Sequence, residues 1–273
     1  MIYDPSTPTH PTGIASVTLS VRDVAQLASF YCKALGLTVR AGATEDAADL
    51  GTGEALLVRL RRTKARRPDR RTAGLFHAAF LLPDRAALAA WLRTATEREV
   101  PVVGASDHGV SEAVYLADPE GNGVEVYADR PEASWRDAAG RLRMPSDRLD
   151  IADLLAVKGE PWVAAPAGTR IGHVHLSVSN IATTETFWTG EMGLSVTTRY
   201  PGAAFFGWGG YHHHIAVNNW AVRSAPVPAD DAPGLAAITF QGGALLREAL
   251  RDPGTRARLT TASVDQPLSV HPS

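Results

Sequence analysis

The stretch IASVTLSVRDVAQLASFYCKALGLTV (residues 14–39) is repeated as IGHVHLSVSNIATTETFWTGEMGLSV (residues 171–196), at a constant offset and without a gap. Identical pairs at this offset include Leu19 with Leu176 and Phe30 with Phe187. A repeat of this length is typical of an internally duplicated chain, in which each copy is one supersecondary unit. The duplication therefore predicts the architecture before any single residue is considered.

Each copy predicts the order β-α-β-β-β. In the first copy, residues 16–21 alternate apolar and polar side chains like a strand, Asp23 is a candidate N-cap, and Gly36 ends the apolar-periodic helix. Further strands are expected over residues 37–40 and 55–60. The same order is expected in two more modules, over residues 74–127 and 171–220, and a fourth module starts at residue 234.

The fourth module is shortened, and we expect a helix over residues 244–250 followed almost at once by a closing strand. The predicted fold class is therefore α+β, with four βαβββ modules of which the last is incomplete. The sequence predicts three regions: an N-terminal domain of modules one and two (11–130), a connector (131–169), and a C-terminal domain of modules three and four (170–260).

Composition excludes several classes of protein. With 273 residues, 45% apolar residues and a net charge of −2, the chain is long enough for sizeable cores and is a poor candidate for binding nucleic acid. The basic run at residues 61–71 is better explained as a solvated loop than as a phosphate site. A single cysteine, Cys32, excludes an internal disulfide and a multi-cysteine metal site. Because no signal peptide or long apolar run is evident, we expect a cytoplasmic protein without a membrane partner.

Three motifs carry a resemblance to a known family. LSVRDVAQLASFYCKALGL (residues 19–37), its copy at 176–194, and YLADPEGNGVEVYADRP (115–131) resemble the vicinal oxygen chelate superfamily of glyoxalase I, bleomycin resistance proteins and extradiol dioxygenases. HHHIAVNNWA (212–221) and GRLRMPSDRLDIADLL (140–155) resemble its four-module bacterial catechol 2,3-dioxygenase-like branch. The resemblance implies modules paired into half-open mixed-sheet barrels, each able to enclose a divalent metal.

The resemblance also implies where metal ligands lie, near the start of the first strand and in the middle of the last strand of each module. In modules two and three these positions hold His77, Glu125 and His173, together with Ala216. In modules one and four they hold Ser16, Arg59, Ala237 and Arg258, none of which is a good ligand. Two imidazoles and one carboxylate resemble the ligand set of a non-haem Fe(II) centre, with Mn(II) as the other candidate. Module two would then pair with module three, and module one with module four.

Glu125 has two readings from the residues alone. It stands between Val124 and Val126 on a predicted strand, so its side chain points to the opposite face from both valines. Either that face meets solvent, or the carboxylate is buried and needs a cation partner.

Several further histidines are candidates for catalysis. If residues 212–214 lie on a strand, His212 and His214 share the cavity face and His213 points away. His175 shares a face with His173 by the same rule. We therefore predict His214, His212 and His175 as acid or base groups, or as a replacement ligand, since histidine titrates near neutral pH.

The function implied by the resemblance is ring cleavage of a catechol- or hydroquinone-like aromatic by dioxygen, with a histidine accepting the phenolic proton. The partners would be the aromatic substrate, dioxygen and, across an open strand edge, a second copy of the chain in a homodimer. His108 is equally well explained as a turn residue or as a catalytic group.

Two alternatives to this function remain open. One is a glyoxalase-like metal-dependent lyase or isomerase, against which Ala216 argues, and the other is a metal-free resistance protein that binds an aromatic drug.

Overall fold

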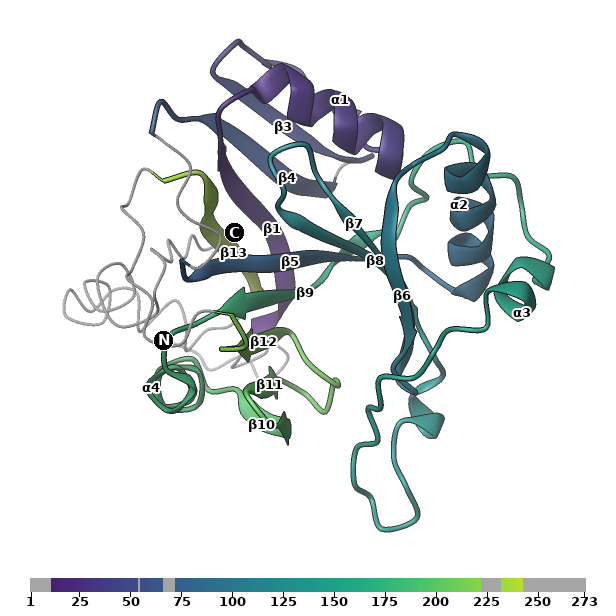
Figure 1. The fold of residues 1–273 in the computed structure, drawn as a ribbon, viewed down its shortest axis with the longest axis vertical. Helices are drawn as coiled ribbons and strands as arrows, with labels where there is room; N and C mark the ends of the chain where they lie inside the picture. The colour runs from purple at the N-terminus through teal and green to yellow at the C-terminus, as the bar shows by residue number, and fades with distance from the viewer. Residues whose placement is uncertain (1–10, 54, 66–71, 222–231, 243–273) are drawn as a thin grey trace, which may run out of the picture. The chain divides into compact units, whose positions relative to one another are not determined.

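A computed structural model describes residues 11–53, 55–65, 72–221 and 232–242. The fold is mixed α+β, dominated by strands with few helices, and the sheet is not closed on itself (Figure 1). No helix within these residues is both long and apolar enough to cross a membrane.

The predicted order of elements is confirmed in three modules. Module one consists of β1 (Pro11–Val21), α1 (Val24–Leu35), β2 (Thr38–Val39), β3 (Ala47–Thr52) and β4 (Ala55–Arg62). Module two consists of β5 (Gly74–Leu81), α2 (Arg85–Glu97), β6 (Val102–Asp107), β7 (Ser111–Ala117) and β8 (Gly123–Asp129). Module three consists of β9 (Arg170–Ser177), α4 (Ile181–Thr186), η2 (Phe187–Glu191), β10 (Ser195–Tyr200), β11 (Ala203–Gly207) and β12 (Ile215–Asn218).

Module four contributes β13 (Gly234–Gly242) to the described residues. The helix predicted at 244–250 and the slot of Arg258 lie outside them. The segment between modules two and three contains a 3₁₀ turn, η1 (Glu132–Ser134), and a short helix, α3 (Ile151–Ala156).

The chain forms two compact units. The first unit is Val21–Arg62 with His77–Gly172, and the second is Met1–Ser20 with Thr63–Phe76 and His173–Ser273. Strands β1, β5 and β9 run from one unit into the other. The domain limits expected at residues 130 and 170 stay a prediction.

In the first unit, α1 packs against the antiparallel strands β3 and β4 (Figure 1). Its ends are those predicted: the Asp23 side chain accepts a hydrogen bond from the Gln26 N–H at 2.9 Å, and Gly36 adopts a left-handed conformation with φ 66°. These caps satisfy backbone groups that the helix itself leaves unpaired.

Module two places the site residues of this unit. β5 pairs in parallel with β8, while β8, β7 and β6 pair antiparallel in sequence. α2 packs against β8, and its Trp91 donates a hydrogen bond from Nε1 to the Ala34 carbonyl of α1 at 2.8 Å. The two modules are thereby joined through their helices.

The segment between modules two and three packs onto module two. α3 contacts α2, and the Arg93 guanidinium donates to the carbonyls of Leu155 and Val157 at 3.0 and 2.9 Å. Leu154 is fully buried. This segment is therefore part of the core of the first unit rather than a free linker.

In the second unit, β1 pairs antiparallel with β13, which joins the first strand of module one to module four. β9 pairs in parallel with β12, and β12, β11 and β10 follow as antiparallel neighbours. The helix of module three is shorter than α1 and ends in the π-helical turn η2. Its threonine-rich sequence and Gly190 have lower helix propensity than the alanine- and leucine-rich α1, which accounts for the irregular end.

Candidate metal centre

Glu125 and His77 lie on neighbouring strands of module two. In the parallel pairing of β5 with β8, Glu125 is opposite Ala79, two residues from His77, so both side chains lie on one face. Their exposed fractions are 2% and 6%, and His77 Nε2 lies 2.9 Å from Glu125 Oε2. Of the two readings of Glu125, the structure supports the buried carboxylate with a polar partner.

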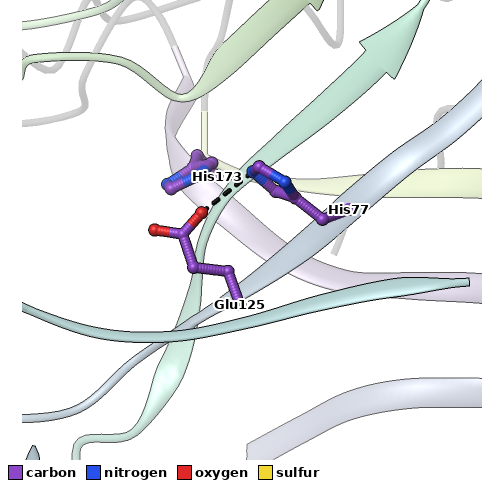
Figure 2. Close-up of side chains that lie close together, drawn as sticks. All are labelled: His77, Glu125 and His173. Carbon is purple, nitrogen blue, oxygen red and sulfur yellow. Dashed lines mark ion pairs between the residues drawn. The ribbon is translucent and has the colours of Figure 1, made fainter. Parts of the chain in front are cut away.

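His173 is buried on β9 and completes the group predicted as metal ligands. One ligand atom from each of His77, Glu125 and His173 lies within 4.8 Å of the others (Figure 2). Ligand atoms bound at about 2.0 to 2.2 Å from a divalent ion lie about 3 Å or more apart, so this group fits such an ion. Two neutral imidazoles and one carboxylate are also a donor set that transition metals accept.

Where the structure describes them, the corresponding slots of modules one and four carry no comparable group. Ser16 is buried on β1 and Ala237 on β13, while Arg59 lies 3.9 Å from the Asp49 carboxylate in an ion pair. Arg258 lies outside the described residues. Within the residues that the structure describes, the one cluster of three potential ligands is that of His77, Glu125 and His173.

Tyr115 is a site residue that the sequence analysis missed. It lies directly opposite Glu125 in the β7–β8 pairing and forms a side-chain hydrogen bond with it. Burial, followed by the charge of Glu125 and this hydrogen bond, raises the pKa of Tyr115 far above its ordinary value. A signal was present, because residues 115 and 125 are equally far from Glu120 in the turn, and hairpin residues at equal distances from a turn face each other.

His108 supports Tyr115 from the β6–β7 turn. Its Nε2 lies 2.8 Å from the Tyr115 hydroxyl oxygen, and its Nδ1 lies 2.9 Å from the Pro145 carbonyl oxygen. A carbonyl oxygen only accepts, so Nδ1 carries a proton. Of the two roles left open for His108, the structure places it in the turn and also connects it, through Tyr115, to Glu125.

The expectation that His212, His213 and His214 lie on a strand is wrong. β12 begins at Ile215, and the three histidines follow a turn at Gly209 and Gly210, both with positive φ. Side chains of a loop do not alternate between two faces as those of a strand do. The face assignment for these residues therefore does not hold.

His213, which had been assigned to the far face, lies beside His173, with 4.1 Å between the ring centroids and the two rings tilted by 47°. His212 contacts His213, with 2.8 Å between their Nδ1 atoms. Both side chains are buried. The structure thus adds His213 to the surroundings of a predicted metal ligand.

The other predicted catalytic histidines have identified neighbours. His214 Nδ1 accepts a hydrogen bond from the Trp208 backbone N–H at 3.3 Å. His175 Nε2 lies 3.0 Å from the Asn218 amide nitrogen, and its ring meets Phe76 at 4.9 Å. Both histidines are buried, and the catalytic roles of His214, His212 and His175 stay predictions.

Known proteins resemble this chain in sequence and in fold. The family model described as "Glyoxalase/Bleomycin resistance protein/Dioxygenase superfamily" matches residues 13–126. The catechol-2,3-dioxygenase of Bacillus subtilis (strain 168) is 39% identical over 230 residues, which cover 82% of this chain and 80% of that protein.

Two solved structures share the fold at low identity. The cppA protein of Streptococcus pneumoniae TIGR4 aligns with a TM-score of 0.55 at 10% identity, over 97% of this chain and 99% of that one. A glyoxalase I mutant from Zea mays aligns with a TM-score of 0.51 at 13% identity, over 89% and 82%. With the sequence match to the Bacillus enzyme, these findings show that the chain belongs to the glyoxalase/bleomycin resistance protein/dioxygenase superfamily.

Proposed function

We propose that this protein is a metal-dependent extradiol-type dioxygenase that opens the ring of a catechol- or hydroquinone-like aromatic. The observation that carries the proposal is the buried group of two imidazoles and one carboxylate. The printed name of the 39% identical Bacillus relative supports the reaction class.

The residues that would hold the metal are His77, Glu125 and His173. Fe(II) is the metal we propose, with Mn(II) as the second candidate, because both accept this mixture of ligands. When bound, such an ion supplies open coordination positions for a diol and for dioxygen, and couples the electron exchange between them.

The protein itself contributes proton handling and ligand orientation. His213 lies beside His173, so it is placed to receive a phenolic proton from a substrate held at this group. His214, His212 and His175 remain part of the proposal as further acid or base groups. Tyr115 orients the Glu125 carboxylate through its hydroxyl.

A glyoxalase-like activity fits the residues less well. Its proton transfer would use a carboxylate at both last-strand positions of the paired modules. One of these holds Glu125, but the other holds the buried Ala216, which offers no acid or base group. This difference favours oxygen chemistry over isomerisation.

A homodimer is also part of the proposal. β6 pairs along its length with β7, and its Val102 and Val103 side chains are 45% and 68% exposed. An apolar strand edge of this kind favours pairing with a second copy. Sedimentation equilibrium tests it, and a monomer at all concentrations would contradict it.

The decisive experiment is metal analysis of protein purified without oxygen, combined with oxygen uptake on substituted catechols. We expect one Fe or Mn per chain, oxygen consumption, and the yellow ring-opened product. Metal-free protein that still binds an aromatic drug after a His77→Ala change would instead establish a resistance protein.

A further inference from the structure

Two carboxylates face each other on module two, away from the candidate ligands. Asp107 of β6 pairs directly with Glu112 of β7 in the antiparallel register, and the Glu112 side chain is 3% exposed. Like charges opposite each other on neighbouring strands repel and destabilise the pairing. A cation between them is therefore needed.

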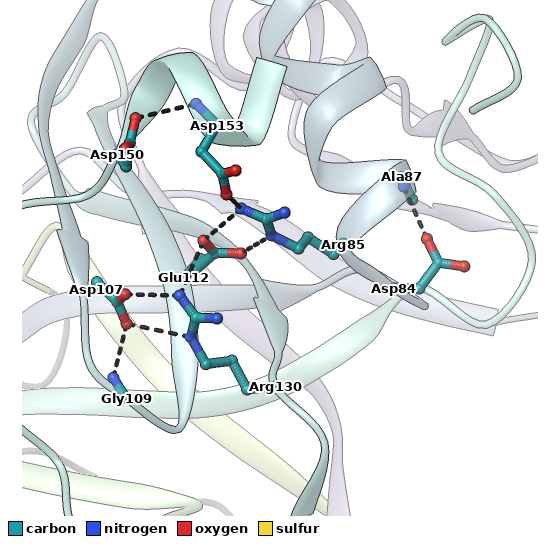
Figure 3. Close-up of polar contacts among 9 residues, drawn as sticks. All are labelled: Asp84, Arg85, Ala87, Asp107, Gly109, Glu112, Arg130, Asp150 and Asp153. Carbon is teal, nitrogen blue, oxygen red and sulfur yellow. Dashed lines mark hydrogen bonds and ion pairs between the residues drawn. The ribbon is translucent and has the colours of Figure 1, made fainter. Parts of the chain in front are cut away.

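Arg130, the residue directly after β8, supplies that cation. Its Nη2 atom lies 2.6 Å from Asp107 Oδ2 and 3.1 Å from Glu112 Oε1 (Figure 3). A second arginine, Arg85, binds Glu112 from the start of α2 at 2.5 and 3.0 Å and also binds Asp153. Of these two arginines, the one that reaches Asp107 is Arg130.

Asp107 in turn holds the β6–β7 turn. Its Oδ1 accepts the Gly109 backbone N–H at 2.8 Å, and the His108 backbone N–H donates to the Ser111 carbonyl at 2.9 Å. Gly109 has φ 70°, a conformation that side-chain-bearing residues rarely adopt. The turn carrying His108 is thus closed on the carboxylate that Arg130 binds.

The orientation of the His108 ring follows from this turn. Nδ1 donates to the Pro145 carbonyl, and Nε2 meets the hydroxyl of Tyr115, the partner of Glu125. A shift of the turn would break both contacts at once, because the ring is held at its two nitrogens.

We propose that Arg130 is a positioning residue of the candidate metal centre, which bridges Asp107 and Glu112 and so holds the His108 ring against Tyr115. This inference rests on the proposed function only where turnover is concerned, because the contacts that it describes do not depend on the reaction. The contacts themselves run from Arg130 through Asp107, the turn and His108 to Tyr115, and end at Glu125. Arg85 shares Glu112 but binds Asp153 of α3 where Arg130 binds Asp107, so it has no such role.

The two arginines provide a matched pair for the test. Their side chains are almost equally exposed, at 32% for Arg130 and 33% for Arg85, and each binds Glu112 and one aspartate. Arg130→Gln and Arg85→Gln therefore remove the same charge from the same buried carboxylate. Only the Arg130→Gln change also removes the arginine that binds Asp107.

The first readout is the ¹⁵N spectrum of the His108 imidazole in metal-free protein, since it reports which nitrogen carries the proton. In the unaltered protein we expect protonated Nδ1. In Arg130→Gln we expect the Nδ1 signal to move away from its hydrogen-bonded position, because release of the turn weakens the hydrogen bond from Nδ1 to the Pro145 carbonyl. Arg85→Gln should leave the spectrum unchanged, and Arg130→Lys should restore it in part.

The second readout is the dissociation constant for Mn(II). We expect Arg130→Gln to weaken binding by about 10-fold, the lower end of the range for outer partners of a metal ligand, and Arg85→Gln to leave it unchanged. If Arg130→Gln does not fold, Asp107→Asn replaces it and should shift the same spectrum. An unchanged His108 spectrum in a folded Arg130→Gln protein, or equal shifts in both arginine variants, would overturn the proposal. Absence of ring cleavage in the unaltered protein would refute the dioxygenase function and leave the spectral test intact.

Discussion

His77 Nε2 lies 2.9 Å from Glu125 Oε2, and both side chains are buried. A buried carboxylate is stable only with a hydrogen-bonded or charged partner, because it has lost its hydration. Module two therefore contains a polar site within its core. A divalent ion would satisfy the same carboxylate more fully, and the first prediction follows from this.

Changing Glu125 to Gln should weaken metal binding strongly. The amide keeps the size of the side chain but removes the charge that competes with water for the ion. We expect the Mn(II) dissociation constant to rise by more than the roughly 10- to 100-fold typical of losing an outer partner of a ligand. Isothermal titration calorimetry with Mn(II) measures this dissociation constant.

Glu185→Gln is the control for this change, because Glu185 forms a surface ion pair with Arg199. It should leave Mn(II) affinity unaltered. Retained affinity and full activity in the Glu125→Gln protein would remove Glu125 from the ligand set.

The histidine loop yields a comparison between neighbours. His213→Phe removes the imidazole that lies beside His173, whereas His214→Phe removes an acceptor of the Trp208 N–H. We expect both proteins to keep metal, and turnover to fall by about 10²-fold or more in the variant that lacks the acid or base group. From its position, His213 should be that group. Greater loss of turnover in His214→Phe would return the role to His214, and loss of metal in either variant would identify a ligand.

Gly172→Ala should perturb β9 immediately before His173. A methyl group at this position would lie 1.8 Å from the Tyr127 hydroxyl and 3.0 Å from Leu81 Cβ, so the backbone or Tyr127 must move. Overpacking of this kind typically costs about 1–3 kcal/mol. Chemical denaturation and Mn(II) titration should therefore show loss of both stability and metal affinity.

Gly190→Ala is the matched control, since its added methyl group meets nothing within 4 Å. A double change, Gly172→Ala with Tyr127→Phe, should recover part of the lost stability because the two sites are coupled. A Gly172→Ala protein as stable as the unaltered one would contradict the close approach.

Acid should weaken the turn that carries His108. Burial raises the pKa of Asp107, but hydrogen bonds from Arg130 and the Gly109 N–H, together with the Arg130 charge, outweigh it and lower the pKa below its ordinary value of 3.8. A carboxyl whose pKa is lower in the folded state stabilises the protein above the unfolded-state pKa. That contribution is lost as the pH falls through the folded-state pKa.

The free energy of unfolding should therefore differ between the unaltered protein and Asp107→Asn near neutral pH, and the difference should shrink below a pH of about 4. Urea denaturation at a series of pH values measures it. A difference that stays constant down to strongly acidic pH would show that the Asp107 charge does not stabilise the turn.

Much of the fold was predictable because its signals are local. Asp23 and Gly36 act on backbone groups within a few residues, so the ends of α1 could be read directly from the sequence. The same holds for the β-α-β-β-β order of three modules, since apolar periodicity reports which face of each element is buried. The exposed or buried state of Glu125 could not be read in this way, because strand alternation separates two faces without saying which one meets solvent.

By itself the sequence determined the duplication and the order of elements in modules one to three, which follow from repeated local patterns. The candidate ligands His77, Glu125 and His173 came from its resemblance to the superfamily. Only the tertiary structure decided that Arg130 joins Asp107 to Glu112 and that His213 lies beside His173. These contacts depend on strand register and on the path of a loop. Both are set by hydrogen bonds and packing between residues far apart in the chain, where local propensity carries no information.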